Sequence, residues 1–172
     1  MEINIGDSVT LNDVEQKICK AVANARHKTN RKSNVHNAKV GNQSNEQTDL
    51  DGVSGEMAFC KLADIYPKDI FVIHPKSAKR GSDKKGDVTY LGKTVDIKTT
   101  AYRTGHLLAT EGKTPDVDYF ALIIRDRDKY VFKGFMKSTE LLEDKRLKLF
   151  KKGQKVKSYV ASQDELKEMP PQ

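Results

Sequence analysis

The segment 87–99 holds the side chains whose types and spacing could do chemistry. It reads as two short β-strands joined at Gly92-Lys93, a pair that suits a type II′ hairpin turn. A turn at this point makes Asp87 and Asp96 diagonal neighbours on one face of the hairpin, with Lys98 beside both. Carboxylates this close repel each other unless a cation neutralises them. A Mg²⁺ ion, which proteins hold with one or two carboxylates, would do so, and the alternative is a set of exposed ion pairs.

Two further features bear on this predicted site. Lys98 can orient or deprotonate a water molecule, or stabilise the negative charge that develops on a phosphate. Glu56 falls beside Val53 and Phe59 in a predicted helix, within an apolar stripe where a carboxylate is costly unless it meets a cation or hydrogen-bond donors. The alternative for Glu56 is a first-turn residue that the helix dipole favours.

Together these residues resemble the PD-(D/E)XK nuclease superfamily, in particular its small phage-encoded members. The likeness rests on the helical Glu56, on Asp87, and on Asp96-Ile97-Lys98 in the following strand. It covers residues 26–166 of the chain. One departure is Gly86, which stands where the proline of the superfamily's name would be.

The resemblance implies a role for each of these residues. Asp87, Asp96 and the main-chain carbonyl of Ile97 would bind Mg²⁺, or Mn²⁺ in its place. Glu56 would bind the metal directly or through water, and Lys98 would position the attacking water. The side chains of Glu56, Asp87, Asp96 and Lys98 would then form one catalytic site.

The resemblance also implies a fold and an activity. The fold would be a single α/β domain over residues 1–172, with a restriction-endonuclease-like core in which helices flank a central mixed β-sheet. The activity would be Mg²⁺-dependent hydrolysis of phosphodiester bonds in DNA. The alternative is a protein of the same fold that binds nucleic acid, or serves as a phage accessory factor, without turnover. Strand preference, DNA against RNA, endo- against exonuclease action and formation of a homodimer all stay open.

Excess positive charge points to a polyanionic partner. The chain has 31 Lys and Arg against 24 Asp and Glu, a net charge of +7. The surplus gathers in the segments 26–41, 76–103 and 129–157, for which solvated lysine-rich loops are the alternative. The candidate nucleic-acid contacts are Arg26, Lys28, Arg31, Lys32, Lys79, Arg80, Lys84, Lys85, Tyr102, Arg103 and His106. The basic residues would hold phosphates, and the tyrosine would stack a base.

Apolar periodicity predicts the helices that position these residues. One helix is expected over 11–25, and a second over 53–66, begun by Asp51 or Ser54. Between them, residues 27–50 lack periodicity and read as a long polar, basic loop.

Strands are expected after the second helix. Residues 70–73 read as a short buried strand, and residues 118–124 as a strand buried on both faces that pairs with 129–135. Ser162-Gln-Asp-Glu165 is a capping box for a final helical turn. The order of helices and strands indicates an α/β or α+β domain.

The composition excludes several classes of protein. No apolar run approaches the ~18 residues of a membrane span, so no membrane partner is expected. Cys19 and Cys60 form neither a disulfide framework nor a metal-ligand pattern. The N-terminal residues lack a basic and hydrophobic secretory signal. A cytoplasmic location is expected, in the bacterial host if the protein is phage-encoded.

Overall fold

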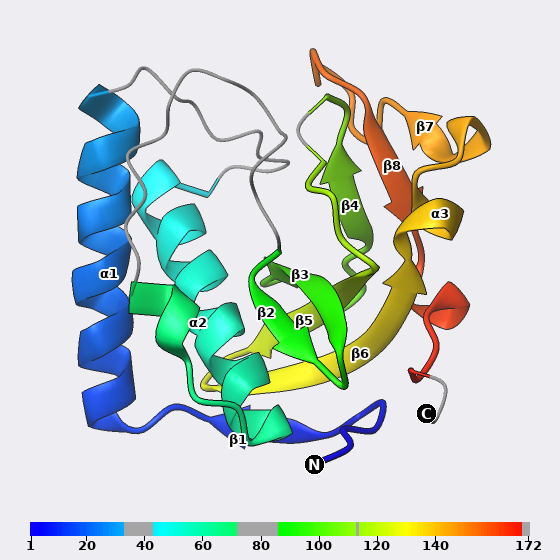
Figure 1. Ribbon diagram of the computed structural model, residues 1–172. Coiled ribbons are helices and arrows are strands. Elements are labelled where there is room, and N and C mark those ends of the chain that lie inside the picture. The colour runs from blue at the N-terminus through cyan, green and yellow to red at the C-terminus, as the bar shows by residue number, and fades with distance from the viewer. Residues whose placement is uncertain (33–42, 72–85, 113, 170–172) are drawn as a thin grey trace.

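A five-stranded mixed β-sheet forms the centre of the protein in this computed structural model (Figure 1). The structure describes residues 1–32, 43–71, 86–112 and 114–169. The sheet consists of β1 (Ser8–Thr10), β2 (Val88–Tyr90), β3 (Lys93–Thr100), β5 (Tyr119–Asp126) and β6 (Lys129–Lys137). Its strand order is β1-β6-β5-β3-β2, in which β3 and β5 run parallel and the other neighbours antiparallel. The prediction of one α/β domain with a mixed sheet is confirmed.

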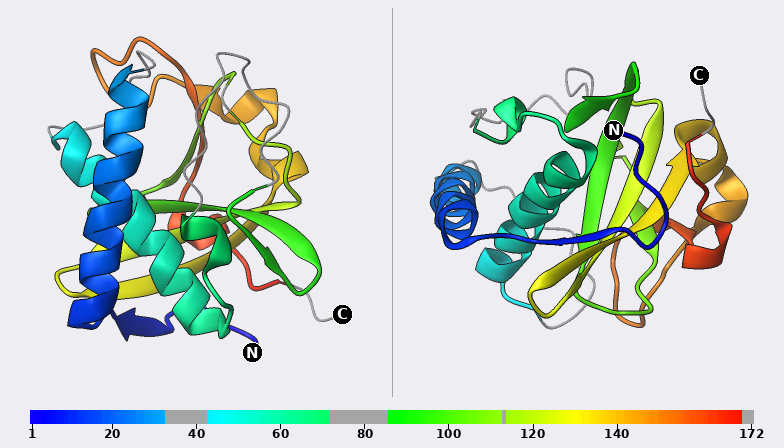
Figure 2. Two further views of the ribbon diagram at one scale, coloured as in Figure 1. Left: turned by 60° about the vertical axis from the view of Figure 1, so that its left-hand side comes forward. Right: turned by 90° about the horizontal axis from the view of Figure 1, so that it is seen from below.

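Two long helices lie on one side of this sheet: α2 (Asn45–Ala63) packs on the strands, and α1 (Asp13–Lys32) packs on α2 (Figure 2). Phe59 of α2 is fully buried at their interface with the strands. Its ring makes edge-on contacts with Tyr90, Phe132 and Phe135, at centroid distances of 5.7, 6.1 and 6.0 Å. Aromatic pairs favour this geometry, so the cluster holds α2 against the sheet.

A second, smaller sheet covers the opposite face. It consists of β4 (Leu107–Thr110), β8 (Ser158–Ala161) and β7 (Leu147–Lys148), with the short helix α3 (Ser138–Leu141) beside it. Leu107 and Leu141 pack there against Phe120 and Leu122 of β5. The prediction that this strand is buried on both faces is confirmed. The expected helical cover is found on the first face, whereas on this face a small sheet supplies most of the apolar contact.

Three short 3₁₀ helices complete the described elements. They are η1 (Lys68–Phe71), η2 (Asp144–Arg146) and η3 (Gln163–Glu165). The expected strand at 70–73 is wrong at its first two residues, which belong to η1, and its last two lie outside the described residues. Among the helices that the structure describes, none is long and apolar enough to cross a membrane.

The two long helices extend into the segment predicted to be a polar loop. The loop prediction for 27–50 is wrong at both ends, because α1 continues to Lys32 and α2 begins at Asn45; residues 33–42 lie outside the described residues. Ser44 caps α2, and its hydroxyl accepts a hydrogen bond from the main-chain N–H of Gln47 at 3.1 Å. The His27 ring lies 2.9 Å from the Asp49 carboxylate. Polar contacts of this kind replace apolar ones between the helices, so hydrophobic periodicity does not detect these turns.

The predicted capping box at Ser162 is present and begins η3. Glu165 accepts hydrogen bonds from the main-chain N–H and the hydroxyl of Ser162 at 2.9 and 3.1 Å, and Arg146 Nη1 donates to it at 2.8 Å. The Ser162 N–H and the Arg146 guanidinium together lower the pKa of Glu165 to about 2. The carboxylate therefore ties the C-terminal segment to η2 in its charged form.

Replacing Glu165 with alanine should lower the free energy of unfolding by about 1 kcal/mol at neutral pH, since both the cap and the ion pair are lost. The Glu165 pKa is lower in the folded chain than its ordinary value of 4.5. Its contribution is therefore complete above that pH and is lost as the pH falls toward 2. Urea titrations of both proteins across this range measure the difference. Glu111→Ala, at an exposed position, is the control, and a difference that persists undiminished in acid would contradict the prediction.

Candidate active site

The β2–β3 hairpin sets the positions of the predicted acidic residues, and its turn differs from the expected one. Thr89 lies opposite Thr94, so the two turn residues are Leu91 and Gly92, with φ angles of 46° and 72°. The expected turn at Gly92-Lys93 is one residue too late, and the expected pairing of Thr89 with Asp96 is wrong. Two positive φ values are typical of a type I′ turn. The sequence does not predict this turn, because its first position usually holds asparagine, aspartate or glycine and here holds leucine. Because the pairing shifts by two residues, each side chain keeps its face of the sheet.

Asp87 lies directly before β2 and binds the main chain of β3. Its N–H donates to the Val95 carbonyl at 2.8 Å, and its Oδ2 accepts from the Ile97 N–H at 2.7 Å. The preceding Gly86 has a φ of 79°, which a proline cannot adopt. This backbone conformation favours a glycine at position 86. Asp87 also lines a cavity of about 160 Å³ next to Tyr66.

Asp96 and Lys98 form an ion pair on β3, on the face turned away from α2. Asp96 is 1% exposed, and its Oδ1 contacts the Lys98 ammonium. The Lys98 side chain retains 35% exposure, and Nζ lies 5.9 Å from the centroid of the Phe120 ring. A buried carboxylate needs such a partner because an uncompensated charge in the interior is costly.

Glu56 on α2 is bound by a residue that the sequence analysis assigned to DNA. Arg26 Nη1 and Nη2 donate to its two carboxylate oxygens at 2.9 and 3.1 Å, and Nη2 also donates to the Ile70 carbonyl at 3.1 Å. The two side chains are 27% and 12% exposed. Arg26 therefore joins α1 to α2, and its role as a nucleic-acid contact stays a prediction.

The charges of these side chains act on one another. Burial alone would lower the pKa of Lys98. The carboxylates of Asp96, Asp87 and Glu56 outweigh this effect and raise the pKa above its usual value, so the amine stays protonated at neutral pH. Burial also lowers the pKa of Arg26, whereas Glu56 and Asp87 raise it. The four predicted catalytic side chains and Arg26 thus form one electrostatic cluster, which we call the Asp87 cluster.

The described residues offer limited metal-ligating chemistry. No group of three or more His, Cys, Asp or Glu side chains among them is arranged to hold a metal ion. Arg26 occupies both oxygens of Glu56. The oxygen donors of the predicted metal site are then Asp87, Asp96 and the Ile97 carbonyl. The role of Glu56 as a metal ligand stays a prediction, and it requires Arg26 to release the carboxylate.

The other predicted nucleic-acid contacts fall into three groups. Lys28 and Lys32 are exposed on the last turns of α1. Lys79, Arg80, Lys84, Lys85 and the side chain of Arg31 lie outside the described residues. The segment after β3 holds the remaining three candidates.

This segment places its candidates in different surroundings. Tyr102 is 55% exposed, and its N–H donates to the Thr100 hydroxyl at 3.3 Å. The Arg103 guanidinium donates to Asp126 Oδ2 at 2.7 and 3.1 Å. The His106 ring packs on the Phe150 ring at a centroid distance of 5.0 Å. The side chains of Tyr102 and Arg103 are therefore exposed to solvent, whereas His106 is half-buried.

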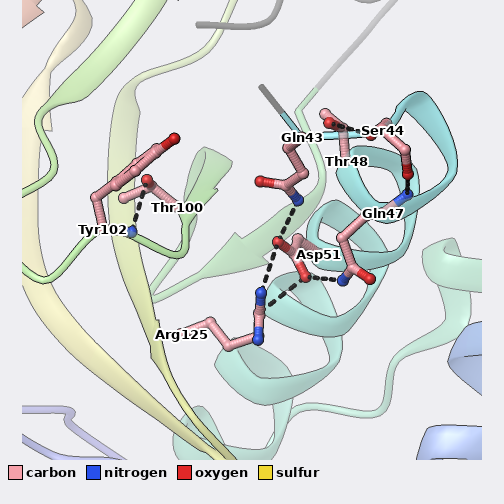
Figure 3. Close-up of polar contacts among 8 residues, drawn as sticks. All are labelled: Gln43, Ser44, Gln47, Thr48, Asp51, Thr100, Tyr102 and Arg125. Carbon is pink, nitrogen blue, oxygen red and sulfur yellow. Dashed lines mark hydrogen bonds and ion pairs between the residues drawn. The ribbon is translucent and has the colours of Figure 1, made fainter. Parts of the chain in front are cut away.

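The sequence analysis missed a polar network on the N-terminal half of α2 (Figure 3). Asp51 is 4% exposed, and its Oδ1 lies 2.9 Å from Arg125 Nε of β5. Gln47 and Gln43 donate their side-chain amides to its two oxygens at 2.7 and 2.6 Å. The prediction that Asp51 begins the helix is wrong, since Ser44 does so. Arg125, at the end of an otherwise apolar strand, was the residue in the sequence that could have indicated a buried acidic partner such as Asp51.

Helix α2 approaches β3 closely at Gly55. A Cβ atom there would lie 1.8 Å from Oγ1 and 2.9 Å from Cγ2 of Thr99. Gly52, one turn earlier, has no such neighbour within 4 Å. The glycine at position 55 is therefore needed for helix–strand contact, whereas the glycine at position 52 is not.

Gly55→Ala should lower the free energy of unfolding by about 1–3 kcal/mol, because the added methyl group overpacks the interface with Thr99. Gly52→Ala is the matched control and should raise it by about 0.5–1 kcal/mol, because alanine favours the helix. Urea unfolding of the three proteins measures both values. The close approach would be refuted if the two alanine variants changed stability in the same direction and by the same amount.

Arg26→Met should lower the free energy of unfolding by about 3 kcal/mol, since it removes the bidentate cation from a nearly buried carboxylate. Replacing Glu56 with methionine in the same protein should recover most of this loss, because no isolated charge then remains. Thermal and urea unfolding of the single and double variants test the coupling. A double variant as unstable as Arg26→Met would contradict it.

Comparison with known proteins places the chain in a family. No curated protein and no solved structure matches it. A family model described as "Family of unknown function (DUF5843)" matches residues 1–169. The match spans β1 to the C-terminal segment, so it includes the hairpin and both long helices. The protein therefore belongs to the family DUF5843.

Proposed function

We propose that the protein is a Mg²⁺-dependent nuclease that hydrolyses phosphodiester bonds in DNA at the Asp87 cluster. The observation that carries the proposal is the ion pair on β3 between the buried Asp96 and the partly exposed Lys98, with the Asp87 carboxylate bound to the N–H of the residue between them. Asp96 and the protonated Lys98 lie on β3, and Asp87 lies beside them, directly before β2. The proposal includes a restriction-endonuclease-like relation between α2, β2 and β3.

The donor set suits a hard divalent cation. Asp87, Asp96 and the Ile97 carbonyl would hold Mg²⁺ through oxygen atoms, and one or two carboxylates with water molecules are its usual protein ligands. The cavity of about 160 Å³ beside Asp87 offers space for water. When bound, the metal polarises the phosphoryl oxygen and lowers the pKa of the attacking water.

Lys98 supplies positive charge in this mechanism. Its raised pKa keeps the amine protonated, so it orients the attacking water by hydrogen bonding and stabilises charge on the phosphate. It does not take the proton of that water at neutral pH. Arg26 holds Glu56 in place and adds a second cation close to Asp87.

Exposed lysines give the proposed enzyme a means of holding DNA. Lys28 and Lys32 lie on α1, and residues 148–157, from the end of β7 to the start of β8, present five more. These are Lys148, Lys151, Lys152, Lys155 and Lys157, all exposed. Lysines bind phosphates without reading the bases, so we expect salt-dependent binding with little sequence preference. A cytoplasmic location and a homodimer belong to the same proposal.

A second candidate function is nucleic-acid binding without cleavage. The observation that favours it is the engagement of each acidic side chain of the Asp87 cluster by protein. Arg26 binds Glu56, the Ile97 N–H binds Asp87, and Lys98 binds Asp96. Such compensation stabilises a fold in the absence of a metal ion.

Purified protein should cleave single- or double-stranded DNA in the presence of Mg²⁺ or Mn²⁺, and EDTA should abolish the cleavage. Lys98→Met and Asp96→Asn should each lower the cleavage rate by about 100-fold or more, since the first removes a positive charge that acts on the reacting phosphate and the second removes a charged metal ligand. Lys93→Met, at an exposed position of the same hairpin, is the matched control and should keep the parent rate. Gel assays on labelled DNA measure the rates, and thermal melting confirms that each variant is folded.

Binding to the same DNA separates the two candidate functions. If folded Lys98→Met binds DNA but does not cut it, the nuclease proposal is supported. If the parent protein binds DNA and leaves it intact with both metals, the non-catalytic function is supported instead. Unchanged cleavage in both site variants would remove the Asp87 cluster from the reaction.

A further inference from the structure

A cavity of about 310 Å³ lies between α1, α2 and the β5–β6 turn, separate from the Asp87 cluster. No side chain of that cluster lines it. Leu11, Leu50 and Tyr130 contribute apolar surface, and Lys20 and Arg127 contribute charge. Its volume falls at the small end of the range typical of ligand-binding pockets.

Arg127 occupies a strained position beside this cavity. Asp126 pairs with Lys129 across the β5–β6 turn, so the turn residues are Arg127 and Asp128. Arg127 has a φ of 62°, a left-handed conformation that glycine adopts without penalty and that favours glycine in a two-residue hairpin turn. Strain of this kind is common where a side chain serves a binding function. The chain keeps an arginine where folding favours glycine, and that arginine lines the cavity.

The cations of the cavity differ in their pairing. Arg125 is bound to Asp51, with its Nε 2.9 Å from Oδ1. Lys20 and Arg127 are exposed, and within the described part of the chain neither forms an ion pair. Arg127 comes from the strand turn and Lys20 from α1, so two positive charges from separate elements meet at one cavity.

We infer that this cavity binds a small phosphate-bearing organic molecule of mononucleotide size. Lys20 and Arg127 would bind the phosphate, since charge-assisted hydrogen bonds to phosphate are the strong contacts such side chains make. Leu11, Leu50 and the Tyr130 ring would contact the organic part. Asp128 lines the same cavity and opposes the phosphate charge, so its neutralisation tightens binding.

Calorimetric titration with AMP, in EDTA to exclude metal-dependent binding elsewhere, tests this inference. The parent protein should bind AMP saturably, and inorganic phosphate should compete with lower affinity because it lacks the organic part. Lys20→Ala and Arg127→Gly should each weaken AMP binding about tenfold. Asp128→Asn should strengthen it, and Lys129→Ala, next to the turn but outside the cavity, should leave it unchanged.

Thermal melting adds a readout that a purely structural role for Arg127 would not reproduce. Without ligand, Arg127→Gly should melt about 2–4 °C higher than the parent because the strain is relieved, although it binds AMP less well. Absence of saturable AMP binding at millimolar concentration would overturn the inference. So would unchanged affinity in both Lys20→Ala and Arg127→Gly, or equal affinity for phosphate and AMP. None of these residues belongs to the Asp87 cluster, so a failure here leaves the nuclease proposal standing.

Discussion

The contact between α2 and β3 is the constraint on which the rest of the structure depends. The helix can lie this close to the strand because residue 55 has no side chain, and Thr99 fills the space that one would occupy. Because the helix lies so close, Phe59 packs in the aromatic cluster and Glu56 lies near the hairpin. The absence of a side chain at Gly55 therefore affects both the packing of the core and the position of the charged residues.

Charge compensation within the protein shapes the candidate site. Asp96 and Glu56 are nearly buried and each faces a cation, Lys98 and Arg26 respectively. The desolvation of these groups is offset by ion pairs before any ligand arrives. A divalent ion entering the cluster would therefore compete with an arginine and a lysine. Affinity for metal at this site depends on how readily Arg26 and Lys98 move, as well as on the number of carboxylates.

Local patterns predicted part of this structure, and contacts between distant residues account for what was missed. The strand over 118–124 was predictable because both of its faces are apolar. Asp96 and Lys98 were correctly placed on one face of β3, because the error in the turn shifted the pairing by two residues. The full length of the helices was not predictable, because polar contacts join them where apolar periodicity ends. The partner of Glu56 was not predictable either, since Arg26 lies 30 residues away and reads as a surface cation.

The pairing of β1 with β6 has a consequence for synthesis of the chain. Val9 lies opposite Tyr130, so β1 leaves the ribosome long before its partner strand β6. The edge of β1 stays unpaired until β6 has been made. Contacts of such long separation slow folding, and an unpaired strand is prone to wrong association during the delay. The short length of β1, three residues, limits that exposure.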